Sequence, residues 1–582
     1  MLLSLALMPA RDRPSPDSLR WVERAGIALL LALLGSAWWT TAWVSDDAFI
    51  TLRTVDNALH GHGLVWNVGQ RVQTYTHPLW MGLVLVASSL TGELFFTLLA
   101  LSAVATAVAL AVLARGVGAS RAGVALALAA ALASRAFVDY ASSGLENPLV
   151  HALVLGLFAV CARRGEGEGL QLARVGLLAA CLLTRLDLLF LAAPLAAFAW
   201  RRDGLPRARV AIAGVAPLVA WEAFSLVYYG ALVANSALAK LAAGIPVGAR
   251  VARGALYFAS SLRDDPVSIA LLVGAPALAF AVRDALRVPG AVAIAAHCAW
   301  VVWVGGDFMR GRFLTPALAV ALALLARAGA GRERAAWAGA AALAIGTVAI
   351  PYLSPFVARD YGPEWHAAID AHGFADERHF HVDISSLASA RRGEGFASAD
   401  EPERVREARA AWFRDPWIDA LAAVGVLDEG DAWPPRSEAE AARVRPVLVK
   451  GGVGLLGYRM GPGVHVIDYH GLGDPLLARL PALREDPVLA RLIPRLAPLG
   501  WRTGHYLRPV PAGYAASRSA GENLVADPDL HALVDRIDLV TSGPLFAAER
   551  WRAIADLHGA FARERIARWA ERRRVAGAPE LR

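Results

Sequence analysis

Residues 25–50 read AGIALLLALLGSAWWTTAWVSDDAFI, and this stretch decides the fold. The apolar run from Ala25 to Trp43 is about long enough to cross the hydrocarbon core of a bilayer as a single helix. Asp46 and Asp47 follow directly, where that helix would leave the membrane. Adjacent carboxylates disfavour each other's ionisation, and charges at a membrane boundary are costly. The sequence therefore predicts a membrane helix that ends at a candidate functional site.

Apolar residues are concentrated in the first 351 positions of this 582-residue chain. Hydrophobic residues make up 56% of the whole chain, against roughly 45–50% in soluble domains. After Tyr352 the sequence becomes charged and mixed, without a further spanning stretch. We predict an α-helical polytopic membrane protein with a cytoplasmic tail at 1–20, a transmembrane domain at 21–351 and a soluble α/β domain at 352–582.

The connectors between apolar segments sort by charge. Many arginines lie in short connectors that the positive-inside rule places in the cytoplasm, so the net charge of +7 does not indicate nucleic-acid binding. Loops 44–77, 230–265 and 305–312 and the C-terminal domain then lie outside the cytoplasmic (inner) membrane. We expect about 11 spans. The apolar segments lie roughly at 25–43, 78–91, 94–114, 122–138, 146–162, 170–183, 185–200, 208–229, 267–282, 289–304, 313–329 and 333–351.

The first outer loop begins with a helical pattern. Phe49, Leu52, Val55 and Leu59 have the spacing of one helix face, and Gly61 follows as a helix terminator. The pattern predicts an amphipathic helix that lies on the membrane surface.

Other polar clusters fall at the outer boundary of the apolar segments. They lie at 143–148, 184–187, 235–240 and 305–312, and all would share one membrane face. Ionisable residues at such positions mark functional sites by default. We therefore predict one cavity on that face.

The order of several motifs resembles a known enzyme group. They are Asp46-Asp47 after the first apolar segment, GLVWNVGQRVQTYTHPLW at 63–80, SGLEN at 143–147, GDFMRGRFL at 306–314, GLGDPLLARLP at 471–481, GHYLR at 504–508 and TSGPLF at 541–546. This series is similar to GT-C glycosyltransferases and, within them, to the terminal β-(1→2)-arabinofuranosyltransferase family of mycobacteria and corynebacteria.

The resemblance implies a polyprenyl-phosphate-linked sugar donor and transfer of the sugar to a cell-envelope polysaccharide outside the cytoplasmic membrane. It also implies that the acidic pair, here Asp46 and Asp47, is the essential catalytic element. The resemblance does not fix the sugar, so arabinofuranose is a narrower prediction than glycosyl transfer. Membrane lipids are the other expected partners.

Asp46 and Asp47 are expected to have different roles, because adjacent helical residues point about 100° apart. One carboxylate would take a proton from the acceptor hydroxyl. The other would orient the acceptor, hold a cation or cap the helix, and Ser45 and Asp46 are both suitable caps. We favour Asp46 as the base. The alternative is that both acids only cap a surface helix.

Cationic residues are needed for the phosphate of the donor. Arg310 and Arg312, separated by one glycine, suit bidentate phosphate recognition and are the first candidates. Lys240, Arg185 and His77 are the others. The alternatives are contact with lipid headgroups for the arginines and a helix-start position for His77.

Five further residues are candidates for sugar or acceptor binding. For the acids among them the alternative is a structural ion pair, and we favour Asp307 as a partner of Arg310. For the aromatic residues the alternative is anchoring at the membrane interface. The five are Glu146, Asp187, Asp307, Trp66 and Tyr75.

No cofactor is demanded by the sequence. Paired aspartates also suit Mg²⁺ or Ca²⁺, but no recognisable metal motif accompanies them.

A transporter or flippase for lipid-linked sugars is the main alternative function, although the segments show no internal repeat and the conspicuous acids lie on a loop. A non-catalytic envelope or flagellar-motor-related membrane protein is the second rival, and it predicts that Asp46 and Asp47 are dispensable.

Overall fold

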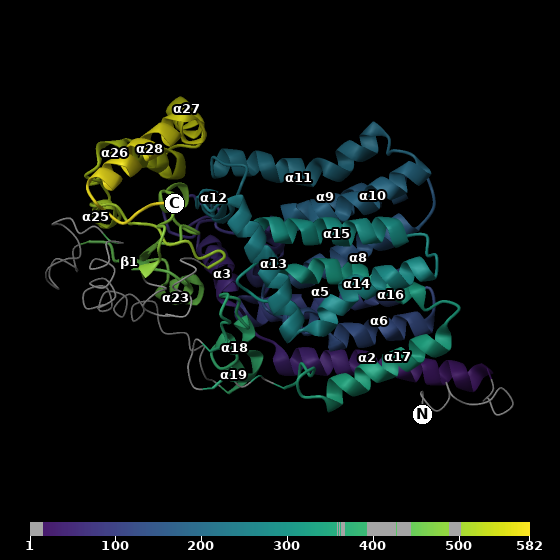
Figure 1. Ribbon diagram of the computed structural model, residues 1–582. Helices are drawn as coiled ribbons and strands as arrows, with labels where there is room; N and C mark the ends of the chain where they lie inside the picture. Colours follow the sequence, from purple (N-terminus) through teal and green to yellow (C-terminus); the bar gives the residue numbers. More distant parts are fainter. Residues whose placement is uncertain are drawn as a thin grey trace.

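The computed structural model describes residues 16–357, 359, 361, 362, 367–392, 427, 444–487 and 502–582. Most of the predicted tail at 1–20 lies outside these residues. The described chain forms a long bundle of helices with a smaller unit at one end (Figure 1). We call this the domain end of the bundle, because it carries the C-terminal domain.

Each predicted apolar segment contains a helix. In chain order these helices are α2 (Pro16–Thr41), α4 (Pro78–Thr91), α5 (Phe95–Val112), α6 (Arg121–Ala133), α8 (Asn147–Ala162), α9 (Glu168–Thr184), α10 (Leu189–Asp203), α11 (Ala208–Tyr228), α14 (Pro266–Ala281), α15 (Arg287–Val304), α16 (Thr315–Ala328) and α17 (Glu333–Ala349). Helix α16 forms the centre of the core, since Arg327 is its only residue that is not buried.

Four helices among the described residues are long and apolar enough to cross a membrane, by length and composition. They are Arg20–Thr41, Phe95–Val117, Ala208–Tyr228 and Arg287–Val304. A fifth span results if α13 (Val247–Asp264) and α14, bent by 106°, count as one. The predicted count of about eleven is not confirmed, because most of the other apolar helices are shorter than the ~20 residues of a perpendicular span.

The arginine-rich connectors gather at the end of the bundle away from the C-terminal domain. Arg202 donates to the carbonyl of Cys161, Arg174 pairs with Asp203 at 2.6 Å, and Arg327 pairs with Asp284 at 3.0 Å. The predicted sorting of connectors into two groups therefore matches the two ends of the bundle.

Several short helices lie at the domain end: α3 (Asp46–Leu59), α7 (Arg135–Asp139), α12 (Asn235–Leu241), α18 (Glu377–His381) and α19 (Leu387–Arg391). The predicted helix after the first span is confirmed as α3, and the Ser45 side chain caps it by accepting from the N–H of Ala48. Its predicted place on the membrane surface is wrong. Phe49, Leu52 and Val55 are fully buried, because they pack against side chains of α4 and α5 while α23 of the C-terminal domain covers the helix.

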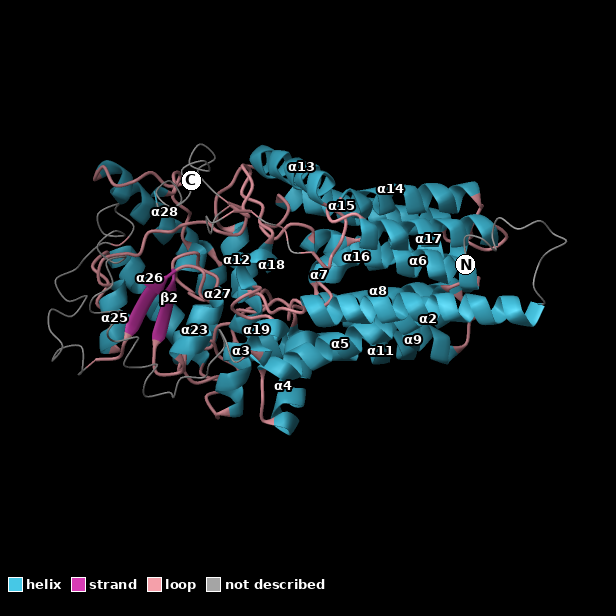
Figure 2. Cartoon of the chain, turned by 90° about the horizontal axis from the view of Figure 1, so that it is seen from below, coloured by secondary structure: helices cyan, strands magenta, loops and turns pink. Residues whose placement is uncertain are grey.

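The C-terminal domain contains a small α/β unit and a helical hairpin region (Figure 2). Strands β1 (Val447–Lys450) and β2 (His465–Asp468) pair in parallel around α23 (Gly454–Met460). Helices α25 (Tyr514–Ala520), α26 (Pro528–Ser542), α27 (Ala548–His558) and α28 (Ala560–Val575) follow. Leu530, Leu533 and Ile537 of α26 are fully buried in the core of this domain. The predicted α/β character is confirmed.

Polar contacts fix the C-terminal domain to the bundle. The fully buried Arg53 of α3 donates to the carbonyls of Val464 at 2.8 Å and of Gly457. Asn67 exchanges two hydrogen bonds with the backbone of Val466, at 2.9 and 3.0 Å. Asn235 of α12 donates to the carbonyl of Gly471 at 2.9 Å. These buried hydrogen bonds thus hold the C-terminal domain against the domain end of the bundle.

Candidate functional site

A cavity of about 430 Å³ lies between the bundle and the C-terminal domain. One part of its wall is apolar and comes mainly from α9, α10, α11 and α15, with Leu182, Phe190, Trp221, Trp300 and Trp303. Another part is charged, with Arg185, Asp187, Glu222, Lys240, Arg250, Asp307 and Arg312. The C-terminal domain contributes Thr503 and Tyr506. This combination suits a ligand with an apolar chain and an anionic group.

Asp47, in the first turn of α3, does not line the cavity itself but contacts the lining residue Arg312. Its Oδ2 lies 3.4 Å from Nη1 of Arg312, which lines the cavity, and 27% of its side chain is exposed. Burial raises the pKa of this carboxyl to about 6, although Arg312 and Lys240 act in the opposite direction. A carboxylate with such a pKa is suited to accept a proton near neutral pH.

Asp46 has a different environment. Its two oxygens accept from the backbone N–H groups of Gly454 at 2.9 Å and Leu455 at 2.8 Å, at the start of α23. Burial raises its pKa, while these two hydrogen bonds lower it. The prediction that the two acids differ agrees with this geometry, but the geometry favours Asp47 over Asp46 as the base. Asp46 holds the C-terminal domain against α3.

Arg312 is the centre of a buried ion-pair cluster. It lies 3.4 Å from each of three carboxylates, those of Asp47, Asp307 and Glu146. The predicted pairing of Asp307 with Arg310 is therefore wrong, since Asp307 pairs with Arg312. The cluster fixes Asp307 and Asp47 around one guanidinium.

Glu146 joins several cations behind the cavity. Its carboxylate is fully buried and lies 3.0 Å from Arg185 and 3.3 Å from His77. Burial alone would raise its pKa, but Arg312, His77 and Arg185 together hold the pKa below its usual range. His77 also hydrogen-bonds Thr51 at 2.9 Å and does not line the cavity. His77 thus supports Glu146 in this structure.

The cations of the cavity divide into two kinds. Arg185 is paired with Asp187 at 2.9 Å as well as with Glu146. Lys240 of α12 and Arg250 of α13 make no ion pair among the described residues, and the Arg250 guanidinium lies over the Trp303 ring at 5.1 Å. These two cations are available to an anionic ligand.

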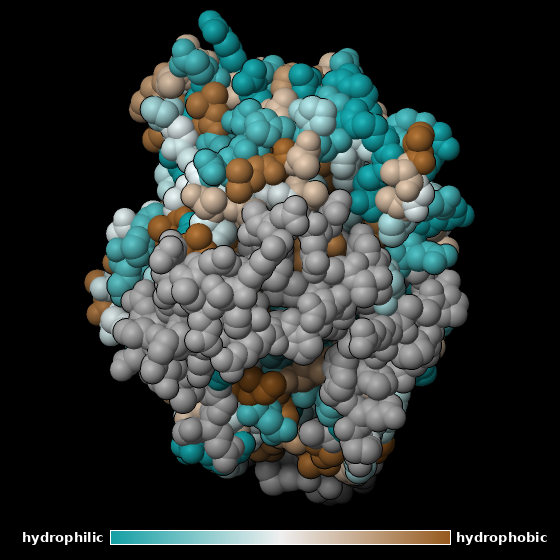
Figure 3. All heavy atoms as spheres, turned by 90° about the vertical axis from the view of Figure 1, so that its left-hand side faces the viewer, coloured by the Kyte–Doolittle hydropathy of each residue, from teal (hydrophilic) through white to brown (hydrophobic). Residues whose placement is uncertain are grey.

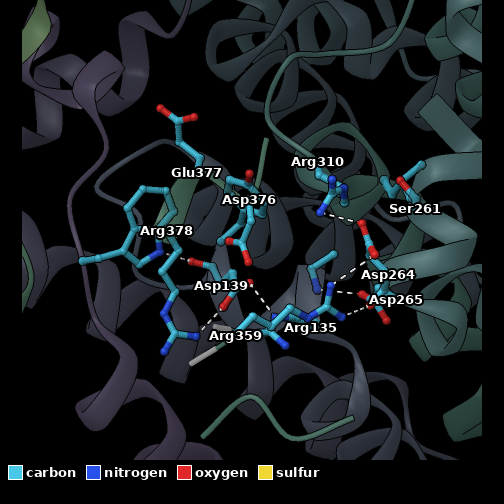
Figure 4. A pocket seen from close by; sticks show the side chains of 15 residues that line it. Arg135, Asp139, Ser261, Asp264, Asp265, Arg310, Arg359, Asp376, Glu377 and Arg378 are labelled. Atoms are coloured by element: carbon cyan, nitrogen blue, oxygen red, sulfur yellow. Dashed lines mark hydrogen bonds and ion pairs between the residues drawn. The ribbon is translucent and has the colours of Figure 1, made fainter. Parts of the chain in front are cut away.

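Arg310 points away from this cavity, because it is paired elsewhere. Its Nη1 lies 2.6 Å from Asp264, and Asp370 is 3.5 Å away. Figure 4 shows Arg310 turned toward Asp264 in a small pocket that Arg135 and Arg359 also line. The structure thus separates the two arginines that the sequence grouped together.

The two aromatic candidates are packed inside the protein. Trp66 is fully buried under the guanidinium of Arg53, at 5.0 Å. The hydroxyl of Tyr75 is bonded to that of Tyr229 at 2.8 Å. Neither lines the cavity.

Sequence reasoning missed Arg250 and Thr503, while Tyr506 could be interpreted from the sequence either as part of an acceptor-binding cap or as a structural polar residue. Arg250 has the sequence pattern of a surface residue on an amphipathic helix, and only the packing of α13 against α15 brings it to Trp303. Thr503 directly precedes the GHYLR motif and Tyr506 lies within it, so this motif was the available sequence signal. No group of three or more His, Cys, Asp or Glu side chains in the described part of the chain could hold a metal ion.

Comparison with known proteins gives two curated relatives, while no family model matches the chain. A terminal β-(1→2)-arabinofuranosyltransferase of Mycobacterium tuberculosis is 29% identical over 533 residues, which cover 80% of this chain and 82% of the relative. An enzyme of the same name from Corynebacterium glutamicum is 27% identical, over 78% of this chain and 74% of the relative. The predicted resemblance to this family is confirmed.

One solved structure is also similar. The crystal structure of ArnT from Cupriavidus metallidurans bound to undecaprenyl phosphate aligns with 77% of this chain and 89% of its own, at 13% identity and a TM-score of 0.42. That likeness is too distant to argue from.

Proposed function

We propose that this protein is an inverting glycosyltransferase that moves a sugar from a polyprenyl-phosphate donor to a cell-envelope glycan. Both curated relatives are glycosyltransferases by name, in agreement with the predicted enzyme class. One observation carries the proposal for this chain. Asp47 contacts Arg312 in the wall of a cavity that joins an apolar surface to Lys240 and Arg250, two cations that pair with no carboxylate among the described residues.

The donor lies with its prenyl chain along the apolar wall and its phosphate at the charged part. Lys240 and Arg250 bind the phosphate, since a charge-assisted contact needs cations that no carboxylate already neutralises. Tyr506, which lines the cavity together with Arg250, closes it from the side of the C-terminal domain. Arg185 and Arg312 add positive potential, although Asp187, Glu146, Asp307 and Asp47 offset most of it.

The transfer itself needs one base and a stabilised leaving group. Asp47 accepts the proton of an acceptor hydroxyl, and the hydroxyl oxygen attacks the anomeric carbon of the donor sugar. The bond from that carbon to the phosphate oxygen breaks on the opposite face, which inverts the configuration. The phosphate leaves with the bonding electrons, and Lys240 and Arg250 stabilise its added negative charge.

The family resemblance supports arabinofuranose as the sugar and the outer side of the cytoplasmic membrane as the location. The arginine-rich end of the bundle would then face the cytoplasm, in accordance with the positive-inside rule. The cavity and the C-terminal domain would face the envelope, where the acceptor glycan lies.

We expect the transfer rate to fall below about pH 6. Burial raises the pKa of Asp47 to about 6, and a general base works only when it is ionised. Below this pH the value of kcat/KM should decrease in proportion to the ionised fraction of Asp47. A pH profile of the purified enzyme in nanodiscs measures it. A profile that stays flat to pH 5, while the protein remains folded, would contradict Asp47 as the base.

Lys240→Met tests the donor site and the enzyme class together. The chain has only two lysines, and Lys450 on β1 gives the matched control Lys450→Met. We expect Lys240→Met to lower kcat/KM about 10- to 100-fold, the value of one hydrogen bond to a charged group, ~1.5–3 kcal/mol. Lys240→Arg should recover part of the loss, and Lys450→Met should keep the wild-type rate.

The assay follows radiolabelled sugar from synthetic polyprenyl-phosphate arabinofuranose to an oligoarabinoside in nanodiscs. A new glycosidic product supports the transferase. Labelled lipid that crosses the bilayer of proteoliposomes, without product, would instead identify a flippase. Wild-type efficiency of Lys240→Met would place the phosphate elsewhere.

A further inference from the structure

The motif TSGPLF at 541–546 has no part in the transfer chemistry, but the structure holds it firmly. Arg71, from the loop at 44–77, donates its backbone N–H to the carbonyl of Thr541 at 2.9 Å and its guanidinium to that of Gly543. Ser542 donates to the carbonyl of Gly69 at 2.8 Å. The turn after α26 is therefore fixed to the bundle.

One buried arginine also fixes this turn to the end of a membrane helix. Arg550 is fully buried and donates from Nη1 to the carbonyl of Leu545 and from Nη2 to that of Tyr228, both at 3.1 Å. Tyr228 is the last residue of α11. Since both carbonyls contact one guanidinium, Leu545 lies at the very end of α11.

Helix α11 marks the membrane boundary at this point. It has 21 residues, and only 17% of its most apolar stretch is buried inside the protein, so most of its surface faces lipid. At 1.5 Å per residue it is about 31 Å long, close to the ~30 Å of the hydrocarbon core. Tyr228, and with it the turn at 541–546, therefore lies at the level of the lipid headgroups.

Apolar side chains are exposed at this level. Phe546 has 78% of its surface exposed, and Leu232 and Val233, which follow α11 and also line the cavity described above, have 54% and 44%. A single exposed apolar residue is common on soluble surfaces, but Phe546 follows Leu545, which lies at the end of a lipid-facing helix. Helices α27 and α28 lie beyond the end of α11 and extend to its outer side (Figure 1), and Figure 3 shows the upper part of this face as mainly hydrophilic with scattered hydrophobic residues.

We propose that the turn at 544–546 rests on the bilayer and inserts Phe546 into the headgroup layer, as an interfacial aromatic anchor. The partner is a phospholipid surface. Because α27 and α28 overhang the bundle, they cover lipid beside α11, and Phe546 gives the C-terminal domain a contact with the bilayer in addition to its contacts with the bundle.

Spin-label accessibility tests this contact. Phe546→Cys is labelled in a chain whose three cysteines, Cys161, Cys181 and Cys298, are replaced by alanine. The protein is reconstituted in phosphatidylethanolamine–phosphatidylglycerol nanodiscs, and collisions with oxygen and with a water-soluble nickel chelate are compared. We expect the ratio of oxygen to nickel collisions at Phe546→Cys to be clearly higher than at a site in water and lower than at a site in the acyl chains.

Two labels calibrate the scale. Leu524→Cys, at a residue 39% exposed on the C-terminal domain, gives the reference collision ratio for a site in water. Val219→Cys, at a residue 59% exposed on α11, gives the reference ratio for a site in the acyl chains. Ala548→Cys, exposed at the start of α27, is a second reporter if Phe546→Cys does not fold. A ratio at Phe546→Cys or Ala548→Cys equal to that at Leu524→Cys would overturn the proposal.

Discussion

Asp47→Asn will lower the rate of sugar transfer by about 10²- to 10⁴-fold, the usual contribution of a general base. Asparagine keeps the size of the side chain and its contact distance to Arg312, but it cannot accept the acceptor proton. Binding of the donor should persist, because Lys240 and Arg250 are untouched. Single-turnover transfer of radiolabelled sugar measures the loss.

Asp46→Asn is the matched comparison, one residue away. An asparagine oxygen can still accept one of the two backbone N–H groups at Gly454 and Leu455. We expect a loss of stability of about 1–3 kcal/mol, the cost of one unsatisfied buried donor, and a much smaller loss of transfer than for Asp47→Asn. Equal and complete loss of transfer in both folded variants would refute the separate roles. Loss in Asp46→Asn alone would reverse them.

Glu146→Gln will destabilise the protein by about 3–5 kcal/mol, the cost of breaking a buried ion pair on one side. Glu146 lies between Arg185 and Arg312, and its carboxylate is fully buried. Glutamine leaves the two guanidinium groups with less compensation and changes the position of Arg312 beside Asp47. Thermal unfolding in detergent, followed by the fraction that stays monodisperse, measures the change.

Glu23→Gln is the control, because it removes the same charge from an exposed pair with Arg121. Surface pairs contribute only about 0–1 kcal/mol, so its unfolding temperature should stay near that of the wild type. The double variant Glu146→Gln with Arg185→Met should recover part of the stability, since it also removes one uncompensated cation. If Glu146→Gln unfolds at the temperature of Glu23→Gln, the cluster does not stabilise the domain end.

The helices were predictable because each apolar run is a local property of the sequence. All twelve predicted segments contain helices, and α3 begins at the predicted cap. The number of spans was not predictable in the same way. Helices of 13 to 17 residues, such as α6 and α9, are apolar enough for a core but short for a bilayer, so their tilt and packing decide their depth.

The candidate site shows a similar limit. Arg310 and Arg312 look equivalent in sequence, but Gly311 between them has a positive φ of 79° and lies against Ala136, so that the chain turns sharply there. Arg310 then faces Asp264 and Arg312 faces Asp47. The different roles of Asp46 and Asp47 could not be predicted in the same way. Asp46 accepts a hydrogen bond from Gly454, about 400 residues further along, and no local sequence pattern indicates that contact.

Thr503 and Tyr506 line the cavity on the side of the C-terminal domain, and their late place in the chain determines when the cavity is complete during biosynthesis. Arg508 ties this segment to α12, donating to the carbonyl of Ala239, next to Lys240, and to that of Tyr506 at 2.9 Å. A ribosome makes the membrane helices of residues 16–349 first and this wall, at residues 503–508, about 150 residues later. A nascent chain whose membrane helices are already in the bilayer therefore has its acids and cations but no closed cavity, and the site for a lipid-linked sugar is complete only after residues 503–508 have been made and have folded onto α12.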